Sequence, residues 1–346
     1  MFTSFLSADL GLDLGSSCVR AALQGQQTAT EVPAAVALRQ RRSGRREIVA
    51  LGEDALAMLG RTPDGLEVVR PVRSGRIVAP EVAEALVRHL LREVDARRWG
   101  RRRVTLAIDP DLPPAEARTL RQVVEAAGAH EVATMPAPLA AALGADIDPG
   151  GSAGHMIVDV GSGTTSIAVV CSDAVVSSAA LDIAGDVFDG AVIRHLVRTH
   201  GLLVGPATAE ALKRELGAAL VPEAATSTVA GRCLRAGTPR AQVVHAEALA
   251  EALVEPVAAL GSAVRRVLEQ TPPEVAADVV DHGVLLTGAG ARLANLDLAL
   301  RAATGLAFLP VDGGDRAVIR GVARHLAPRR LRARTAAAVP ALAPSR

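Results

Sequence analysis

Two short glycine-containing segments, each directly after an apolar run, constrain the fold of this chain more than any other feature. The first is Asp13-Leu-Gly-Ser-Ser and the second is Asp159-Val-Gly-Ser-Gly-Thr-Thr. Apolar residues continue beyond both segments, so each is predicted to be the turn of a strand–turn–strand hairpin. Because the same unit opens each half of the chain, we predict two similar α/β halves that divide near residue 145 and face each other across a cleft.

The residue types in these turns are those that a phosphate chain requires. Glycine lets the backbone approach closely, consecutive amide N–H groups point into one concavity, and Ser and Thr add hydroxyl donors. One turn on each half would grip a triphosphate from both sides, with Asp13 and Asp159 holding Mg2+ directly or through water. One such segment is weak evidence, because an ordinary hairpin after an Asp has the same letters. Two of them favour a nucleotide site.

A third glycine-rich turn is predicted at Leu285-Leu-Thr-Gly-Ala-Gly-Ala-Arg, between a buried strand and a helix. Bare backbone at Gly288, Ala289 and Gly290 gives a flat adenine and its ribose a surface to lie against. A plain strand-to-helix turn is the alternative, and this segment alone does not decide between them.

Composition excludes several classes of protein. The chain has 346 residues, of which 49% are hydrophobic and 1% aromatic, and its net charge is +1. It lacks both the positive field and the stacking platforms that nucleic acid requires, so no nucleic-acid partner is expected. Cys18, Cys171 and Cys233 have no metal-ligand spacing. No signal-peptide pattern and no long apolar span are found, so a cytoplasmic location is expected.

Further motifs carry a resemblance to a known family. Segment 51–63 ends in Gly-Arg-Thr-Pro, segment 69–77 reads Val-Arg-Pro-Val-Arg-Ser-Gly-Arg-Ile, and segment 270–274 reads Gln-Thr-Pro-Pro-Glu. Segments 184–189 (Ala-Gly-Asp-Val-Phe-Asp) and 212–217 (Leu-Lys-Arg-Glu-Leu-Gly) follow the same order and spacing. With the three turns, over about residues 8–326, they resemble the MreB/Mbl family of bacterial actin-like cell-shape proteins, a branch of the actin, Hsp70 and sugar-kinase superfamily.

The resemblance implies an actin-like fold of two RNase H-like α/β domains that face a nucleotide cleft, each with a smaller subdomain. Domain I is expected over 1–145, with subdomain IB at about 32–77 and with the C-terminal helix 316–326 added to it. Domain II is expected over 146–315, with subdomain IIB at about 205–245. The Arg-, Ala- and Pro-rich tail 328–346 is expected to be disordered.

The resemblance also implies ligands and partners. The ligands are ATP or ADP with Mg2+, and the partners are other copies of the chain in a filament, the anionic inner face of the cell membrane, and cell-wall synthesis or morphogenesis proteins. Thr164 is implied to orient the attacking water. The implied nucleotide-binding residues are Asp13, Gly15, Ser16, Ser17, Asp159, Gly161, Ser162, Gly163, Thr164, Gly185, Asp186, Lys213, Glu215, Gly288, Ala289 and Gly290.

Three positions depart from the family pattern. Ala137 stands where the family has its catalytic Glu, at the same spacing from Asp159, and a methyl group cannot position water. Loss of one such group commonly slows a reaction by about 100-fold or more, so we expect slow or absent ATP hydrolysis. Ala289 replaces the middle glycine of a Gly-Gly-Gly turn, where a Cβ would crowd the nucleotide or exclude a positive φ. Ser162 is a change that the superfamily tolerates.

Segment 97–103, Arg-Arg-Trp-Gly-Arg-Arg-Arg, is predicted to contact the membrane from the cytoplasmic side. It contains the only Trp of the chain, and an indole flanked by guanidinium groups suits an anionic surface. The alternative is a solvated basic loop whose Trp folds back onto the body. The residues assigned to the contact are Arg97, Arg98, Trp99, Arg101, Arg102 and Arg103.

The predicted function is therefore a filament-forming, membrane-associated cytoskeletal protein that binds ATP and takes part in cell shape or cell-wall morphogenesis. One alternative is an actin-like scaffold that works without nucleotide. Less favoured are a small-molecule kinase, which needs an acidic base beside its acceptor, and an Hsp70-like chaperone, which needs a separate substrate-binding domain. Neither feature is evident in the sequence.

Overall fold

The computed structural model describes residues 7–24, 26, 28–41, 44–94, 101–220 and 224–326. The elements of the first half are β1 (Ser7–Leu14), β2 (Cys18–Leu23), β3 (Thr30–Pro33), β4 (Val36–Gln40), β5 (Arg46–Leu51), α1 (Gly52–Ala57), β6 (Leu66–Val69), β7 (Val72–Arg73), β8 (Arg76–Ile77), α2 (Pro80–Val94), β9 (Arg101–Ile108), α3 (Pro114–Ala126), β10 (Glu131–Pro136) and α4 (Ala137–Gly144).

The second half continues with strands and helices in the same alternation. Its elements are β11 (His155–Val160), β12 (Thr165–Cys171), β13 (Ala174–Leu181), α5 (Gly185–His200), β14 (Leu202–Leu203), α6 (Pro206–Leu216), β15 (Thr226–Cys233), β16 (Pro239–His245), α7 (Ala246–Glu269), α8 (Pro273–His282), β17 (Val284–Thr287), the 3-10 turn η2 (Ala289–Arg292), α9 (Leu296–Thr304), β18 (Phe308–Pro310), η3 (Gly314–Arg316) and α10 (Ala317–Leu326).

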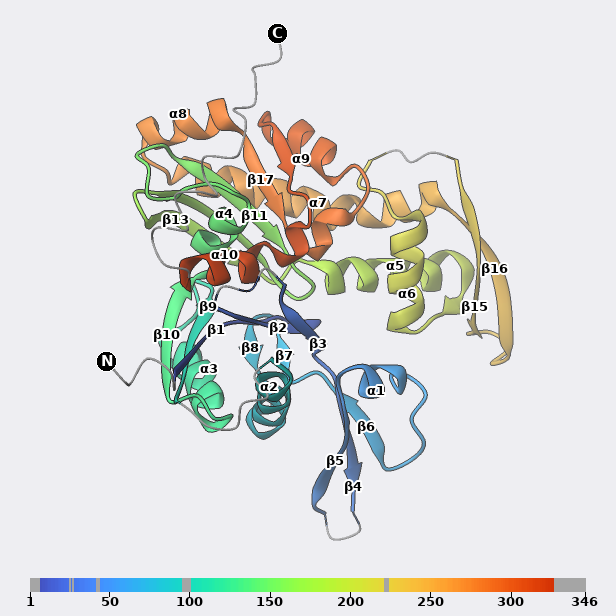
Figure 1. Cartoon of the computed structure of the whole chain (residues 1–346). Coiled ribbons are helices and arrows are strands. Elements are labelled where there is room, and N and C mark those ends of the chain that lie inside the picture. The colour runs from blue at the N-terminus through green and yellow to red at the C-terminus, as the bar shows by residue number, and fades with distance from the viewer. Residues whose placement is uncertain are drawn as a thin grey trace.

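Each half contains one five-stranded sheet, and the two sheets have the same topology (Figure 1). The strand orders are β3-β2-β1-β9-β10 and β13-β12-β11-β17-β18. In the first sheet β1, β2 and β3 pair antiparallel, whereas β9 and β10 run parallel to β1. In the second sheet β11, β12 and β13 pair antiparallel, whereas β17 and β18 run parallel to β11. The prediction of two similar α/β halves is therefore confirmed.

Helix α2 shows how the sequence pattern produces the packing of the first half. Pro80 occupies its first position, where the missing N–H has no helical partner to lose. Its buried residues recur at helical spacing and form one face against the first sheet. Full burial of a Leu or Val side chain contributes about 1.5–3 kcal/mol. These buried residues are Ala83, Leu86, Val87, Leu90 and Leu91.

Helices α4 and α10 cross with their backbones in direct contact, between the two main sheets (Figure 1). A Cβ at Gly321 would overlap the carbonyl of Ala140, and a Cβ at Gly144 would overlap the carbonyl of Ala317. The crossing therefore requires a glycine on each helix. Because α4 is also the link from the first sheet to the second, this crossing lies at the junction of the two halves.

Smaller sheets branch from this frame. They have the orders β5-β4-β6, β7-β8 and β14-β15-β16. In Figure 1 the sheet that contains β4 and the hairpin β15–β16 project away from the two main sheets. The sequence pattern did not indicate β3, the short strands β6, β7, β8, β14 and β18, or helix α8.

Candidate functional site

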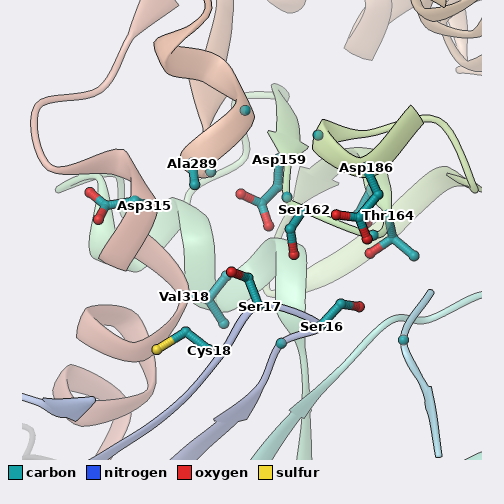
Figure 2. A pocket seen from close by; sticks show the side chains of 18 of the residues that line it. Ser16, Ser17, Cys18, Asp159, Ser162, Thr164, Asp186, Ala289, Asp315 and Val318 are labelled. Carbon is teal, nitrogen blue, oxygen red and sulfur yellow. The ribbon is translucent and has the colours of Figure 1, made fainter. Parts of the chain in front are cut away.

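The three predicted glycine-rich turns meet at one cavity of about 650 Å³ between the two main sheets. This volume is in the range of small-molecule and cofactor sites. Figure 2 shows Ser16 and Ser17 on one side of the cavity and Asp159 and Ser162 on the opposite side. All the residues that the sequence assigned to nucleotide binding line this cavity, and Ala137 lines it with them.

The first turn joins β1 to β2. The Gly15 N–H donates to the Cys18 carbonyl at 3.0 Å, and a Cβ at Gly15 would lie only 2.7 Å from that oxygen. Glycine at this position therefore lets the hairpin close. Ser16 is buried at the tip of the turn, whereas Ser17 is exposed. A turn of this shape directs backbone N–H groups toward an anion.

The second turn joins β11 to β12 and is built in the same way. The Gly161 N–H donates to the Thr164 carbonyl at 2.9 Å. Gly163 is in close contact with the first half, because a Cβ there would overlap the Ser16 side chain and lie 3.0 Å from the Ser74 nitrogen. The Ser74 hydroxyl also donates to the Gly163 carbonyl at 3.3 Å. The two turns are therefore in contact across the cleft.

The third turn follows β17, and its glycines are required at the first and third positions. Gly288 has φ +89°, and a Cβ there would overlap the Val160 carbonyl. A Cβ at Gly290 would lie 2.5 Å from Val160 Cγ1. Ala289 is exposed and is not among the residues with positive φ. Ala289 therefore sits in this turn without a left-handed backbone, which is compatible with its Cβ. Its methyl group does line the cavity.

Asp13 and Asp159 present their carboxylates to the cavity. Thr287 Oγ1 donates to Asp159 Oδ1 at 2.8 Å, and Arg20 Nη1 lies 3.7 Å from Asp13 Oδ2. Burial raises the pKa of Asp159 to about 6, and the Asp13 charge acts in the same direction. Burial also raises the pKa of Asp13, against the opposing effect of Arg20. A bound cation would favour the ionised form of both groups.

This donor set fits Mg2+, which binds proteins through one or two carboxylates and keeps several waters and phosphate oxygens as its other ligands. Among the described residues, no group of three or more His, Cys, Asp or Glu side chains is placed to hold a metal ion. Asp13 and Asp159 would therefore hold the ion together with water and phosphate, and it would supply positive charge at the phosphates.

Helix α6 carries two of the predicted cavity residues, Lys213 and Glu215, and both also contact neighbouring elements. Lys213 Nζ lies 2.8 Å from Asp189 Oδ1 and donates to the Gly185 carbonyl at 3.2 Å. The Ser227 hydroxyl donates to Glu215 Oε2 at 3.0 Å. Lys213 thus connects α6 to the start of α5, and Glu215 connects it to β15.

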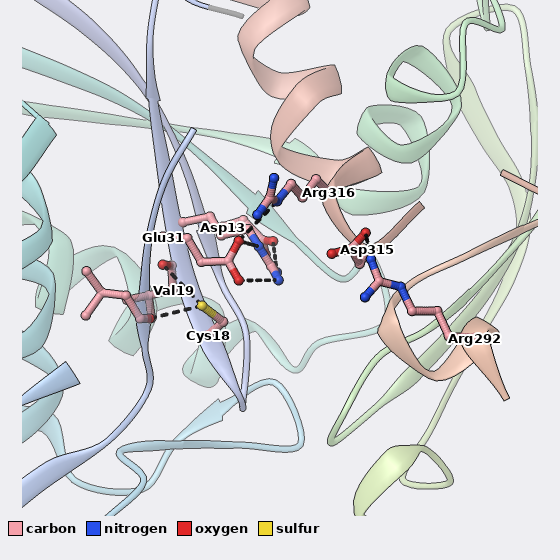
Figure 3. A network of polar contacts seen from close by, with 9 residues as sticks. Asp13, Cys18, Val19, Glu31, Arg292, Asp315 and Arg316 are labelled. Atoms are coloured by element: carbon pink, nitrogen blue, oxygen red, sulfur yellow. Dashed lines mark hydrogen bonds and ion pairs between the residues drawn. The ribbon is translucent and has the colours of Figure 1, made fainter. Parts of the chain in front are cut away.

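A charge network next to the first turn was not predicted (Figure 3). Arg20 donates to both carboxylate oxygens of Glu31, at 3.1 and 3.2 Å, and Arg316 donates to Glu31 at 3.2 Å. Arg20 lines the cavity beside Asp13. A three-residue turn makes Asp13 and Arg20 direct partners in the β1–β2 register, so hairpin pairing was the signal that could have identified this cation.

Two further cavity residues were missed as well. Asp109 directly follows β9 and lines the cavity, although no motif surrounds it. Arg70 lies before β7, and its Nη1 is 3.6 Å from Asp186 Oδ1. This ion pair joins the first half to the start of α5 in the second. Only the folded arrangement brings these residues to the cavity.

The residues assigned to membrane contact fall largely outside the described part of the chain. Arg97, Arg98 and Trp99 lie outside it, as does the side chain of Arg101. Arg103 donates to both oxygens of Asp9, at 2.7 and 2.8 Å, so its charge is already balanced within the protein. The described helices include none with the length and apolarity needed to cross a bilayer.

Comparison with solved structures defines the class of protein. The structure of MreB5 of Spiroplasma citri bound to AMPPNP has a TM-score of 0.86 and 28% sequence identity, and the match covers 91% of this chain and 94% of that chain. The MamK double helical filament has a TM-score of 0.74 at 18% identity, over 92% of this chain and 98% of that chain, and shares the fold. The fold is therefore actin-like, as predicted.

Sequence comparison then gives the family. The family model described as MreB/Mbl protein matches residues 7–333. Cell shape-determining protein MreB of Escherichia coli (strain K12) is 38% identical over 329 residues, which are 94% of this chain and 95% of that protein. Cell shape-determining protein Mbl of Bacillus subtilis (strain 168) is 35% identical over 292 residues, 84% of this chain and 86% of that protein. The chain belongs to the MreB/Mbl family, which confirms the resemblance.

Proposed function

We propose that this protein is a cytoskeletal element of the cell-shape machinery that binds ATP between its two halves and assembles into filaments. The observation that carries this proposal is that two topologically equivalent sheets present their glycine-rich turns to one cavity from opposite sides. A similar protein, MreB5 of Spiroplasma citri, has been solved bound to ADP and to AMPPNP.

Different predicted residues would contact the phosphates, the metal ion and the nucleoside. The N–H groups and hydroxyls of the turns at 15–17 and 161–164 would surround the phosphates, with Asp13 and Asp159 on the side of Mg2+. The turn at 288–290 would lie against the nucleoside, with Gly185, Asp186, Lys213 and Glu215 near it. Nucleotide that touches both turns would stabilise one spacing of the two halves, and the same spacing would favour filament contacts.

We infer that ATP hydrolysis is slow. Ala137 lines the cavity but has no group that accepts a proton from water. Thr164 remains as a water-orienting hydroxyl. A phosphate-release rate equal to that of an MreB with Glu at this position would contradict the inference.

We further propose that the filaments lie at the inner face of the cell membrane, near cell-wall synthesis proteins. Segment 97–103 supplies a Trp among Arg residues, and each basic residue near an anionic surface contributes roughly 1 kcal/mol. Because Arg103 is paired with Asp9, it would make a smaller contribution than an unpaired arginine.

We also propose the division of the chain into domain I at 1–145 with the helix 316–326, and domain II at 146–315. Two large core clusters, one around the first sheet and one around the second, support this division. A separate cluster joins α4 and α10 with residues of both halves.

A nucleotide-independent scaffold is the second candidate. It is favoured by the contact between Gly163 and Ser16, which closes the space between the two turns, and by Arg20, which places a cation beside Asp13. A kinase is less favoured, because the relative that matches 94% of this chain is a cell shape-determining protein.

The deciding experiment measures nucleotide affinity and assembly on the same protein. Fluorescent ATP titration with Mg2+ is followed by sedimentation and electron microscopy with ATP, with ADP and without nucleotide. Asp159→Ala should reduce both binding and assembly, whereas Asp182→Ala, at an exposed position outside the cavity, should reduce neither. Filaments that form equally without nucleotide would favour the scaffold.

A further inference from the structure

Asp109 lies directly beside the position of Ala137. Strands β9 and β10 are parallel neighbours, and their last residues, Ile108 and Pro136, are partners in the register. Asp109 and Ala137 directly follow these two partners, and neighbouring strands lie about 4.8 Å apart. Both line the nucleotide cavity. A carboxylate is thus present one strand away from the position that lacks one.

The structure holds the Asp109 side chain in place through its own loop. Asp109 Oδ1 accepts the Asp111 N–H at 2.9 Å, which is a local turn that Asp side chains favour. Asp111 Oδ1 in turn accepts the hydroxyl of Ser178, on β13 of the second half, at 2.9 Å. In the part of the chain that the structure describes, no ion pair joins Asp109 to an Arg or Lys. Its second oxygen is therefore not neutralised by a cation.

Ser166 provides a second polar group at the same place. Its hydroxyl is buried and has no hydrogen-bond partner among the described residues, although Ser166 lines the cavity and is only 8% exposed. It is the register partner of Asp159 on β12. Burial raises the pKa of Asp109, and the Asp111 N–H and the Ser166 side chain beside it act in the opposite direction. A buried hydroxyl without a partner, next to an uncompensated carboxylate, is a site for an ordered water.

We propose that Asp109 and Ser166 hold the water that attacks ATP, and that Asp109 accepts its proton. This proposal rests on the proposed function, because it requires ATP in the cleft. The water oxygen forms a bond to the γ-phosphorus, and the bond from that phosphorus to the β–γ bridging oxygen breaks. One proton of the water passes to the Asp109 carboxylate and then to solvent, and ADP and phosphate leave. The slow hydrolysis of this protein then depends on Asp109.

The test uses the full chain with Mg2+ and ATP, and measures phosphate release and ATP affinity separately. Asp109→Asn keeps the oxygen that accepts the Asp111 N–H but removes the proton acceptor. We expect it to reduce phosphate release by at least about tenfold while ATP affinity stays within about twofold, since general-base catalysis contributes roughly 10²–10⁴-fold. Asp148→Asn is the matched control, because Asp148 forms the same kind of turn with Gly150 outside the cavity.

A rescue variant separates a chemical role from a structural one. Ala137→Glu places a carboxylate directly after the neighbouring strand β10, so the double variant with Asp109→Asn should recover phosphate release to at least the parent rate. The proposal is overturned if Asp109→Asn leaves phosphate release unchanged, if it weakens ATP binding as much as it slows release, or if the parent binds ATP and releases no phosphate above a buffer blank. A parent that binds no ATP would instead refute the proposed function itself.

Discussion

Gly321→Ala should destabilise this protein, although the same change usually stabilises a helix. Replacing Gly by Ala in a helix interior normally gains about 0.5–1 kcal/mol. At Gly321 the added methyl would lie 2.5 Å from the carbonyl carbon of Ala140 and 2.9 Å from its Cα, where ordinary contacts begin at 3.4 Å. The carbonyl oxygen of Ala140 would lie closer still, and backbone atoms cannot rotate away as a side chain can, so α4 and α10 must separate by more than about 1 Å.

Overpacking of this kind commonly costs about 1–3 kcal/mol, and here it also opens contacts along the whole α4–α10 crossing. We therefore expect a net loss of about 1–2 kcal/mol after the helix-propensity gain. Urea unfolding followed by far-UV circular dichroism measures it. Gly190→Ala is the matched control, because a methyl there meets only the flexible end of Arg194 at 3.2 Å inside α5, and should stabilise the protein. Gly321→Ala with a midpoint equal to or above the parent would refute the close crossing.

Three further predictions concern the cleft and the membrane. Gly163→Ala should weaken ATP binding by about tenfold, because the added methyl would push Ser16 away. Gly205→Ala is the control, because a methyl there meets open space, and it should leave the ATP affinity unchanged. Titration with fluorescent ATP measures both. Burial raises the pKa of Asp159 from 3.8 to about 6, so the folded protein loses stability as the pH rises between these values. The melting temperature of Asp159→Asn should therefore exceed that of the parent by an amount that grows from about pH 4 to about pH 6. A difference that stays constant over this range would contradict the prediction. Trp99→Ala should reduce sedimentation with anionic liposomes, and equal binding would remove this residue from the membrane contact.

The sequence predicted the parts of the fold that short segments encode. An apolar run, a glycine turn and a second apolar run determine a hairpin locally, so the turns at Asp13 and Asp159 were identified together with their strands. The limits of helix α2 are also encoded within one segment, by its apolar spacing and by Pro80 at its first position. Helix α8 was missed even though Pro273 marks its first turn, since its apolar face is short and only Val279 is buried.

The rest of the site depends on contacts between distant segments. Arg316, for example, reaches Glu31 from the far end of the chain. Asp109 becomes a neighbour of Ala137 only because β9 and β10 pair in one particular register. The effect of Ala289 also depended on a backbone angle that the sequence does not contain. In each case the sequence gives the residue type, but only the folded structure gives the distances between the residues.

The short length of α4 has a consequence for how the two ends of the molecule communicate. Its first residue, Ala137, lines the nucleotide cavity, and its last residue, Gly144, lies in the crossing with α10. Eight helical residues span about 12 Å. If nucleotide binds in this cavity as proposed, a displacement of Ala137 would reach the crossing through this one helix, because no loop lies between them. About two turns of helix thus link the residue at the cavity to the contact between the two halves.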